Sequence, residues 1–327
     1  MSKLIEVKSL NVTFYDLAGT LHAVTDLNFS IEKGEVLGVI GESGSGKSVT
    51  SKAIMGFLNS KNVAGEILYE GKNLLKMKEK DMCKLRGSKI SLVFQEPMTA
   101  LNPVMTIGKQ LEEVLVLHKI GDKNSNLEKI KETLRLMNIS DPDAMLSKYP
   151  FELSGGLRQR IMIAMAVLCK PDLIIADEPT TALDVTTQME ILKLLKNVTK
   201  IMGCSVLLIT HDLGVIAECA DRVIVMYRGR KMEECKMEDL FDCAMHPYAH
   251  GLILSRPSNF QGRYYTIEGT VESNYGNNRG CLFQKRCKYC SEKCKNEVPL
   301  EQVFNGDHSV FCWNVEEVKR GEKEWIK

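Results

Sequence analysis

The chain has 327 residues, of which 44% are hydrophobic and 26% charged, the composition of an ordinary globular protein of about two domains. Its 43 Lys and Arg residues nearly balance 42 Asp and Glu residues, so the net charge of +1 gives no general basic field for nucleic acid. The longest apolar stretch is interrupted by Lys170 and Asp172, and the first residues lack the apolar core of a signal peptide. These features exclude a disordered chain and a multi-span membrane protein, and they favour the cytosol.

The first part of the chain predicts three strands and a helix. Apolar and polar positions alternate from residue 4 to residue 31, which predicts an antiparallel pair of strands. A short apolar run at residues 35–40 predicts a further strand that ends at a glycine-rich loop, and residues 47–58 predict a helix after that loop. The order strand, loop, helix is typical of a phosphate-binding unit.

The middle of the chain predicts a helical subdomain followed by a βαβ unit. Strand signals fade from about residue 97 to residue 166, and apolar residues there recur at helical spacing within residues 107–117 and 127–137. Uninterrupted apolar runs, which are typical of buried parallel strands, then return on both sides of a predicted helix. The predicted elements of this unit are a strand at residues 173–176, a helix at 186–202 and a strand at 206–209.

The composition changes after about residue 255. Residues 258–280 are rich in Asn, Gly and Tyr and predict a loop or linker. Five of the 11 cysteines follow residue 280, and in a reducing cytosol clustered cysteines indicate metal or cluster ligands before disulfides. We therefore expect two parts, residues 1–255 and a Cys-rich C-terminal extension of residues 256–327.

The glycine-rich loop matches the phosphate-loop pattern G-x-x-x-x-G-K-[ST] with the sequence Gly41-Glu42-Ser43-Gly44-Ser45-Gly46-Lys47-Ser48. Glycines let backbone N–H groups turn inward around phosphate oxygens, and the following helix N-terminus adds partial positive charge. Lys47 is expected to contact the β- and γ-phosphates and Ser48 to bind Mg²⁺. The nucleotide-binding residues expected in this segment are Gly41, Ser43, Gly44, Ser45, Gly46, Lys47, Ser48 and Val49.

Two adjacent acids end the predicted strand at residues 173–176. Successive side chains of a strand point to opposite faces, so Asp177 and Glu178 are expected to have different roles. One carboxylate can bind Mg²⁺, and the other can face the γ-phosphate and the attacking water.

Six motifs, in the order of the family, together resemble those of ABC-transporter ATPases. Besides the phosphate loop and the paired acids, these are Gln95, the segment Leu153-Ser154-Gly155-Gly156-Leu157-Arg158-Gln159-Arg160, Ala182-Leu183-Asp184 and Thr210-His211-Asp212. The resemblance covers about residues 3–250. It implies an α/β fold, a P-loop ABC-type nucleotide-binding domain with a RecA-like core, an antiparallel β subdomain and a helical subdomain.

The resemblance also implies roles for these residues. Two subunits would close head to tail on two ATP molecules, with Ser154, Gly155 and Gly156 of each subunit facing the phosphate loop of the other. The catalytic set would be Glu178 as base, His211 as γ-phosphate sensor, Lys47 and Gln95, while Asp184 would act across the dimer. The Mg²⁺ ligands would be Ser48, Gln95 and Asp177, and the adenine would stack on Phe14 or on the adjacent Tyr15.

Two sequence segments, residues 95–103 and His246-Pro247-Tyr248, resemble segments of the ATPase subunits of oligopeptide, dipeptide and nickel importers. We expect His246 to have a structural role. The resemblance implies an ATP-hydrolysing motor subunit that imports peptides or nickel and other metal chelates from the cytoplasmic face of the cell membrane. Its partners would be a second ATPase subunit, here taken as a paralogue, two transmembrane permease subunits and an extracytoplasmic substrate-binding protein, without nucleic acid. The alternative is a soluble ABC ATPase of DNA repair, translation or Fe–S cluster assembly.

The C-terminal cysteines are candidate metal ligands. Cys281, Cys287, Cys294 and Cys312 supply the four thiolates that either a [4Fe-4S] cluster or a tetrahedral Zn²⁺ requires, with Cys290 as an alternate ligand. Their spacing by itself indicates a metal without naming it, and free thiols remain a third interpretation. The preference for a [4Fe-4S] cluster is implied by the resemblance to the same importer branch.

Overall fold

The computed structural model describes residues 2–17, 19–95, 100–181, 183–255, 266–276 and 279–325. The chain forms two compact units. Unit 1 comprises residues 1–5, 31–36 and 76–209, and unit 2 comprises residues 6–30, 37–75 and 210–327. The expected boundary at residue 255 adjoins residues 256–265, which lie outside the described residues. No helix in the described ranges has the length and apolar character needed to cross a membrane.

Unit 1 contains three parallel strands in the order β6-β7-β8, with bounds β6 (Ile90–Val93), β7 (Leu173–Asp177) and β8 (Ser205–Ile209). Every residue of β7 and β8 is buried, as expected for strands covered on both faces. Helix α8 (Val185–Met202) connects β7 to β8. The predicted βαβ unit is therefore present, with each element within a residue of its expected bounds.

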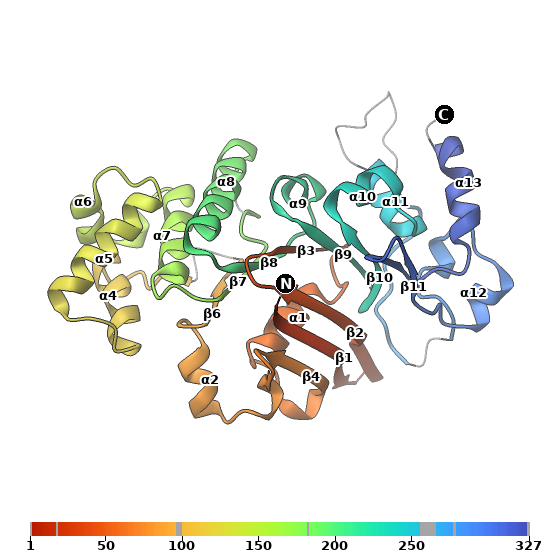
Figure 1. The fold of residues 1–327 in the computed structure, drawn as a ribbon, viewed down its shortest axis with the longest axis horizontal. Helices are drawn as coiled ribbons and strands as arrows, with labels where there is room; N and C mark the ends of the chain where they lie inside the picture. The colour runs from red at the N-terminus through yellow and green to blue at the C-terminus, as the bar shows by residue number, and fades with distance from the viewer. Residues whose placement is uncertain are drawn as a thin grey trace. The chain divides into compact units, whose positions relative to one another are not determined.

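The predicted helical subdomain of unit 1 is also present (Figure 1). It consists of α4 (Ile107–Leu117), α5 (Lys123–Leu136), α6 (Pro142–Ser147) and α7 (Gly155–Val167), and unit 1 further contains α2 (Glu79–Leu85). Helix α5 begins four residues before the prediction, because the Asp122 carboxylate accepts the backbone N–H groups of Asn124 and Ser125 at 3.0 and 2.9 Å and caps the helix there.

A four-stranded sheet in the order β2-β1-β4-β5 lies almost wholly in unit 2. Its strands are β1 (Lys3–Asp16), β2 (Gly19–Glu32), β4 (Val63–Tyr69) and β5 (Lys72–Asn73). Strands β1 and β2 are hydrogen-bonded neighbours joined by two residues, and so short a connection requires an antiparallel pair, as the alternating sequence predicts.

The other strands of unit 2 have the order β3-β9-β10-β12-β11. Strand β3 (Val36–Ile40) runs parallel to β9 (Arg222–Tyr227), which pairs antiparallel with β10 (Arg230–Lys236). Beyond β10 lie two strands from the Cys-rich part of the chain, β12 (His308–Val310) and β11 (Gln302–Phe304). The C-terminal extension thus contributes directly to a sheet of unit 2.

The helices of unit 2 are α1 (Lys47–Ile54), α9 (Leu213–Cys219), α10 (Met237–Cys243), α11 (Pro247–Leu254), α12 (Glu292–Asn296) and α13 (Val315–Trp325). Helix α1 is four residues shorter than predicted, because Gly56 adopts a left-handed φ of 65° and its N–H bonds to the carbonyl of Ala53, which ends the helix. Of the predicted linker, residues 266–276 contain neither helix nor strand.

Candidate functional site

The phosphate loop of unit 2 has a backbone that only glycine tolerates at two positions. Gly41 and Gly46 have φ values of 154° and 97°. A Cβ at Gly41 would lie 2.1 Å from the carbonyl oxygen of Met226, and one at Gly46 would lie 2.5 Å from that of Ala23. The loop is therefore pressed against neighbouring backbone, in the type of conformation that forms anion-binding concavities.

Lys47 directs its ammonium group back into this loop. The side chain is 5% exposed, and Nζ donates to the carbonyl oxygens of Gly41 at 2.7 Å and Glu42 at 3.1 Å and to Ser45 Oγ at 3.3 Å. The concavity thus holds a positive charge where an anion would bind, and α1 begins at the same residue. Ser48 and Val49 are half-buried, while Ser43 and Gly44 are exposed.

The other candidates in unit 2 lie on β1 and after β8. Phe14 is half-buried, and Tyr15 is 72% exposed, so Tyr15 offers the more accessible ring. His211 is exposed. The backbone N–H of Thr210 bonds to the carbonyl of Val39 at 3.2 Å, which places the segment containing His211 beside the strand that leads into the phosphate loop.

The paired acids of unit 1 occupy different environments. Asp177 ends β7 and is 9% exposed, whereas Glu178 is half-buried and has a left-handed φ of 48°. The Glu178 carboxylate accepts hydrogen bonds from Gln95 Nε2 and from Thr181 Oγ1, each 3.0 Å from Oε2. A non-glycine residue held at positive φ stores strain and is typical of a functional position. The sequence indicated Gln95, but no sequence signal singled out Thr181.

Residues 153–160 and the segment before α8 each supply a helix cap in unit 1. Ser154 Oγ accepts the backbone N–H of Leu157 at 3.4 Å and caps α7, whose first residues, Gly155 and Gly156, are exposed and half-buried. Asp184 caps α8, where hydrogen bonds from the backbone and the hydroxyl of Thr187 lower the pKa of its carboxyl. A Cβ at Gly156 would lie 2.8 Å from Thr187 Cγ2, so the two segments touch. Glu96–Thr99 and Ala182 lie outside the described residues.

The C-terminal cysteines lie close to one another in unit 2. Burial, and after it the charges of Cys294 and Cys290, raise the pKa of Cys281 to about 11, and burial with the charges of Cys281 and Cys294 raises that of Cys312 to about 12. Burial raises the pKa of Cys287 as well, with additional contributions from Cys281, Cys312 and Cys294. The thiols thus affect one another electrostatically, but among the described residues no three of these sulfur atoms lie within 4.8 Å of one another, so the structure does not bring them together as a tetrahedral set.

Hydrogen bonds reach several of these sulfur atoms. Asn314 donates its backbone N–H to Cys312 Sγ at 3.4 Å and its side-chain amide to Cys294 Sγ at 3.6 Å. Ser291 Oγ lies 3.3 Å from Cys294 Sγ. At Cys281 and Cys287, burial raises the pKa most, and the backbone at positions 283 and 289 lowers it. Such bonds stabilise negative charge on sulfur, and the thiolate is the form of cysteine that binds a metal ion or a cluster.

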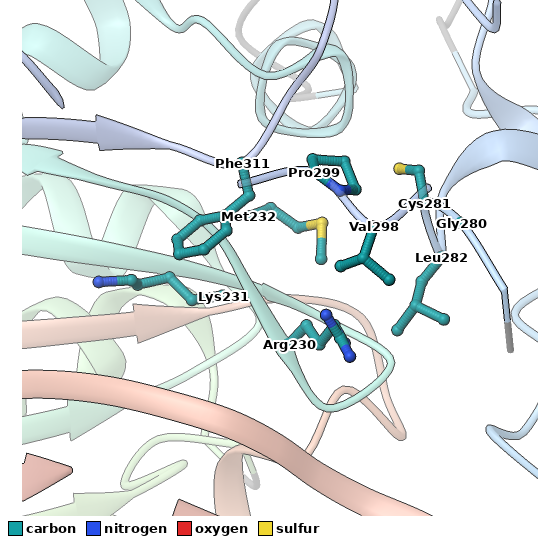
Figure 2. A pocket seen from close by; sticks show the side chains of 9 residues that line it. All are labelled: Arg230, Lys231, Met232, Gly280, Cys281, Leu282, Val298, Pro299 and Phe311. Atoms are coloured by element: carbon teal, nitrogen blue, oxygen red, sulfur yellow. The ribbon is translucent and has the colours of Figure 1, made fainter. Parts of the chain in front are cut away.

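Cys281 also lines a small pocket with mostly apolar walls (Figure 2). The apolar lining residues come from β10 and from three C-terminal segments: Met232, Leu282, Val298, Pro299 and Phe311. An apolar surround of this kind limits water access and lowers the local dielectric constant around a metal site.

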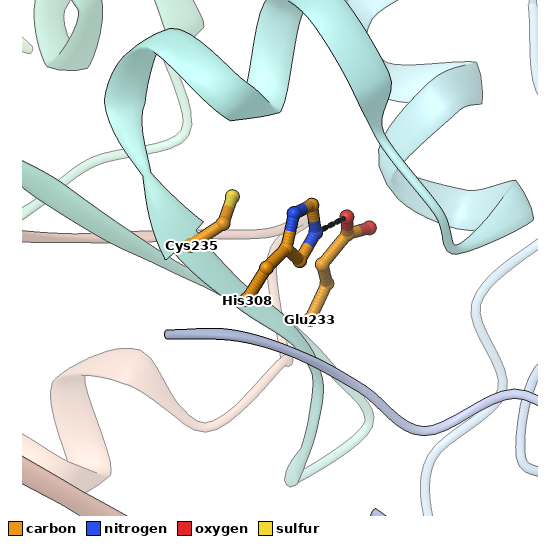
Figure 3. A group of neighbouring side chains, drawn as sticks. All are labelled: Glu233, Cys235 and His308. Atoms are coloured by element: carbon orange, nitrogen blue, oxygen red, sulfur yellow. Dashed lines mark hydrogen bonds and ion pairs between the residues drawn. The ribbon is translucent and has the colours of Figure 1, made fainter. Parts of the chain in front are cut away.

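A separate buried group joins the C-terminal strands to β10 (Figure 3). Glu233 Oε1 accepts the backbone N–H of Met245 at 2.7 Å and lies 2.6 Å from His308 Nε2, while Oε2 accepts the N–H of His246 at 2.8 Å. Cys235 lies within 4.8 Å of both side chains. Because hydrogen bonds already satisfy both carboxylate oxygens, we interpret this group as the attachment of β12 rather than as a metal site.

His246 has the structural role that the sequence analysis expected. Its side chain is fully buried, and burial lowers its pKa to about 3. Neutral Nδ1 accepts the backbone N–H of Tyr248 at 3.0 Å and caps α11.

Comparison with known proteins matches two regions of the chain to protein families. Residues 24–181 match the family model of the ABC transporter, and residues 232–294 match that of the oligopeptide/dipeptide transporter C-terminal region. The chain is 45% identical to the dipeptide transport ATP-binding protein DppD of Bacillus subtilis and to the oligopeptide transport ATP-binding protein OppD of Salmonella typhimurium, each over 96% of this chain and 95% of the relative. It is 44% identical to a probable peptide ABC transporter ATP-binding protein of Sinorhizobium fredii, over 96% of both chains.

Solved structures agree with this fold. A dimeric ATP-binding cassette in a post-hydrolysis state with ADP and phosphate matches with a TM-score of 0.64 and 28% identity, over 71% of this chain and 98% of that one. The cbiO1 subunit of the Clostridium perfringens cbiONQ transporter matches with a TM-score of 0.65 and 28% identity, over 74% and 92%. The fold and the motifs thus define an ABC-type ATPase. More narrowly, the chain belongs to the family of ABC-transporter ATP-binding subunits that includes the oligopeptide and dipeptide transporters.

Proposed function

We propose that this ATPase drives the import of peptides. The named relatives carry peptide, dipeptide or oligopeptide transport in their descriptions, which supports peptides over nickel chelates as cargo. The proposed assembly has two permeases, a second and different ATPase subunit and an extracytoplasmic binding protein, with this chain on the cytoplasmic face of the membrane. The soluble alternatives in DNA repair, translation or cluster assembly have no support among these relatives.

In the proposed nucleotide site, the phosphate loop of unit 2 holds the phosphates. In unit 2, Lys47 exchanges its bonds to loop oxygens for the β- and γ-phosphates, and Ser48 Oγ is the proposed Mg²⁺ ligand. In unit 1, the proposed Mg²⁺ ligands are the Asp177 carboxylate and Gln95. Phe14 or Tyr15 covers the adenine. Bound ATP with Mg²⁺ supplies the phosphoanhydride bond and part of the charge neutralisation that phosphoryl transfer requires.

The environment of Glu178 is the observation that most directly supports hydrolysis. Its carboxylate is oriented by Gln95 and Thr181 on a strained backbone, the setting expected for a group that must polarise a water molecule in one direction. His211 is proposed to contact the γ-phosphate. The exposed start of α7 at Ser154, Gly155 and Gly156 would complete the site of a second subunit, and Asp184 would lie at the same interface.

A pocket next to Gln95 supports the proposal that this chain binds a permease. An apolar pocket in unit 1 is lined by residues of β6, α4 and α7 and of the segment between β6 and α4. Its lining includes Phe94, Leu101, Val114, Leu117, Met162 and Met165. Phe94 is 51% and Leu117 71% exposed, which is costly for such large apolar side chains unless a partner covers them. We assign this pocket to a short apolar segment of the permease. A permease segment bound there would contact Phe94, which directly precedes Gln95. Because Gln95 donates a hydrogen bond to Glu178, binding of the permease would affect the position of the Glu178 carboxylate.

We also propose that Cys281, Cys287, Cys294 and Cys312 are the ligands of a [4Fe-4S] cluster. Zinc is the alternative metal, and Cys290 is the alternate ligand. The hydrogen bonds that Asn314 donates to the sulfurs of Cys312 and Cys294 support it, as does the backbone bond from Cys281 N–H to the carbonyl of Cys294. Residues 256–327 would then be a C-terminal extension of the nucleotide-binding part, residues 1–255, and its strands β11 and β12 extend the strands of unit 2 beyond β10.

The transport proposal is tested by purifying the tagged chain from detergent-solubilised membranes and identifying its partners. Two permeases and a second ATPase are expected, together with ATPase activity that rises when the peptide-loaded binding protein is added to the reconstituted complex. Recovery of soluble proteins or nucleic acid alone would overturn it.

A further inference from the structure

An ion pair connects the Cys-rich segment to the phosphate loop. Arg286 Nη1 lies 2.7 Å from Glu42 Oε2 and Nη2 lies 3.1 Å from Oε1, a bidentate contact between residues 244 positions apart in the sequence. Glu42 is the second residue of the phosphate loop, and Arg286 immediately precedes the candidate ligand Cys287. The Arg286 side chain is only 5% exposed and that of Glu42 is 30% exposed. Partly buried bidentate pairs are stronger and less screened than pairs at the surface.

Arg286 is held in place by contacts other than Glu42. Its Nε donates to the carbonyl oxygen of Glu268 at 2.9 Å, and Nη2 also donates to that of Ile267 at 3.2 Å. The guanidinium carbon lies 5.7 Å from the ring centre of Tyr227 and 6.0 Å from that of Phe283. The guanidinium is thus oriented before any ligand arrives.

The backbone of Glu42 is held from the C-terminal side as well. Its N–H donates to the hydroxyl of Tyr248 at 2.9 Å. The Tyr248 ring is fully buried and packs against Tyr227 and Phe283, at centroid distances of 4.8 and 5.3 Å. Main chain and side chain at position 42 are therefore both held by residues outside the phosphate loop.

The charge of Glu42 makes this contact relevant to nucleotide binding. A carboxylate within a phosphate loop repels the negative phosphates that the loop must bind. The bidentate contact with Arg286 neutralises that carboxylate and directs its oxygen atoms toward the guanidinium. Loss of the arginine would leave an uncompensated negative charge in the loop, where Lys47 supplies the positive charge for the phosphates.

We propose that Arg286 is a positioning residue for ATP, which makes the affinity of the phosphate loop depend on the Cys-rich segment through neutralisation of Glu42. This inference rests on the proposed nucleotide site. It adds a role for the C-terminal segment within each subunit, beyond holding a metal or a cluster. Any change that moves residue 286, including loss of the ligands next to it, is expected to weaken ATP binding.

The test measures the dissociation constant of ATP by equilibrium titration of the full chain, without relying on turnover. Arg286→Met keeps the length and apolar packing of the side chain but removes its charge, and it should weaken ATP binding on the order of tenfold at low salt. The loss should shrink as ionic strength rises, because repulsion by the exposed part of Glu42 is screened. Lys285→Met is the matched control, since Lys285 pairs with exposed Glu272 at 2.8 Å and should bind ATP like the wild type.

The double variant Arg286→Met with Glu42→Gln separates charge from structure. If the unpaired carboxylate causes the loss, removing it should restore most of the affinity even though Arg286 is still absent. A double variant as weak as Arg286→Met would show that Arg286 only supports the fold, and unchanged binding by Arg286→Met would also overturn the inference. Wild-type protein that fails to bind ATP would instead overturn the proposed nucleotide site, so the two failures are distinguishable.

Discussion

Gln95 donates its side-chain amide to Glu178 at 3.0 Å, so a residue that follows one strand orients a carboxylate at the end of the neighbouring strand. The two residues are 83 positions apart in the sequence. Thr181 donates to the same carboxylate oxygen at 3.0 Å, so two neutral donors hold one charged acceptor. Neutral donors orient the carboxylate and leave it negatively charged, as a group that accepts a proton from water must be.

Glu178→Gln should abolish most turnover while leaving ATP binding intact. The amide keeps the size of the side chain but cannot accept a proton, so kcat for ATP hydrolysis should fall by about 10²- to 10⁴-fold. Steady-state phosphate release and nucleotide titration measure the two properties separately. Glu190→Gln is the control, because exposed Glu190 forms an ion pair with Arg160 rather than with the proposed catalytic residues, and this variant should retain wild-type turnover. Hydrolysis unchanged in Glu178→Gln would remove Glu178 as the base.

Thr181→Val should lower kcat by a few-fold without changing the KM for ATP. The substitution removes the hydrogen bond from Thr181 Oγ1 to Glu178 and nearly conserves the side-chain volume, so the carboxylate is oriented less well. Thr186→Val, at an exposed position in the first turn of α8, is the matched control. Equal kcat values for the two variants would show that Thr181 does not position the base.

Gly46→Ala should destabilise unit 2 and remove nucleotide binding. Its Cβ would lie 2.5 Å from a carbonyl oxygen at a φ of 97°, so strain and overlap together should cost roughly 3 kcal/mol or more. Gly34→Ala has a similar φ of 80° but no atom within 4 Å, and should cost only about 1 kcal/mol. Thermal unfolding compares the two variants. Similar melting temperatures would contradict the close approach at Gly46.

Anaerobically purified protein should contain iron and sulfide, and Cys287→Ser should lose most of both. Elemental analysis and the visible absorption spectrum report the loss directly. Cys83→Ser, at an exposed cysteine of α2, should keep the full content. Stoichiometric zinc without iron in the wild-type protein would reject the cluster and support the zinc alternative.

The buried His246 should make the protein sensitive to acid. Because burial lowers its pKa from 6.5 to about 3, the unfolded chain binds more protons between these values, and stability present above pH 6.5 is lost as the pH falls toward 3. The contribution amounts to at most about 1.4 kcal/mol per pH unit. His246→Asn preserves a cap on α11 and removes the titration, so the free energy of unfolding should fall less steeply with acid. Identical slopes from denaturant titrations would contradict this assignment.

The sequence by itself predicted the elements that depend on local patterns. The phosphate loop, the apolar strand before Asp177 and the helical spacing of residues 107–117 follow from turn chemistry and periodicity, which act over a few residues. Helix ends were less predictable, as α1 shows, because a capping contact at Gly56 ended it before its apolar pattern did. The cysteine spacing indicated a metal but left its identity open.

Only the tertiary structure decided which distant residues meet. No local pattern could show that Thr181 and Gln95 share the Glu178 carboxylate, or that Arg286 neutralises Glu42 across 244 positions. These contacts depend on how strands and loops pack, and the same side chains in sequence are compatible with many other partners. The tertiary structure also shows where the C-terminal cysteines lie. The segment that carries Cys281 and Cys287 contacts the phosphate loop through the ion pair of Arg286 with Glu42.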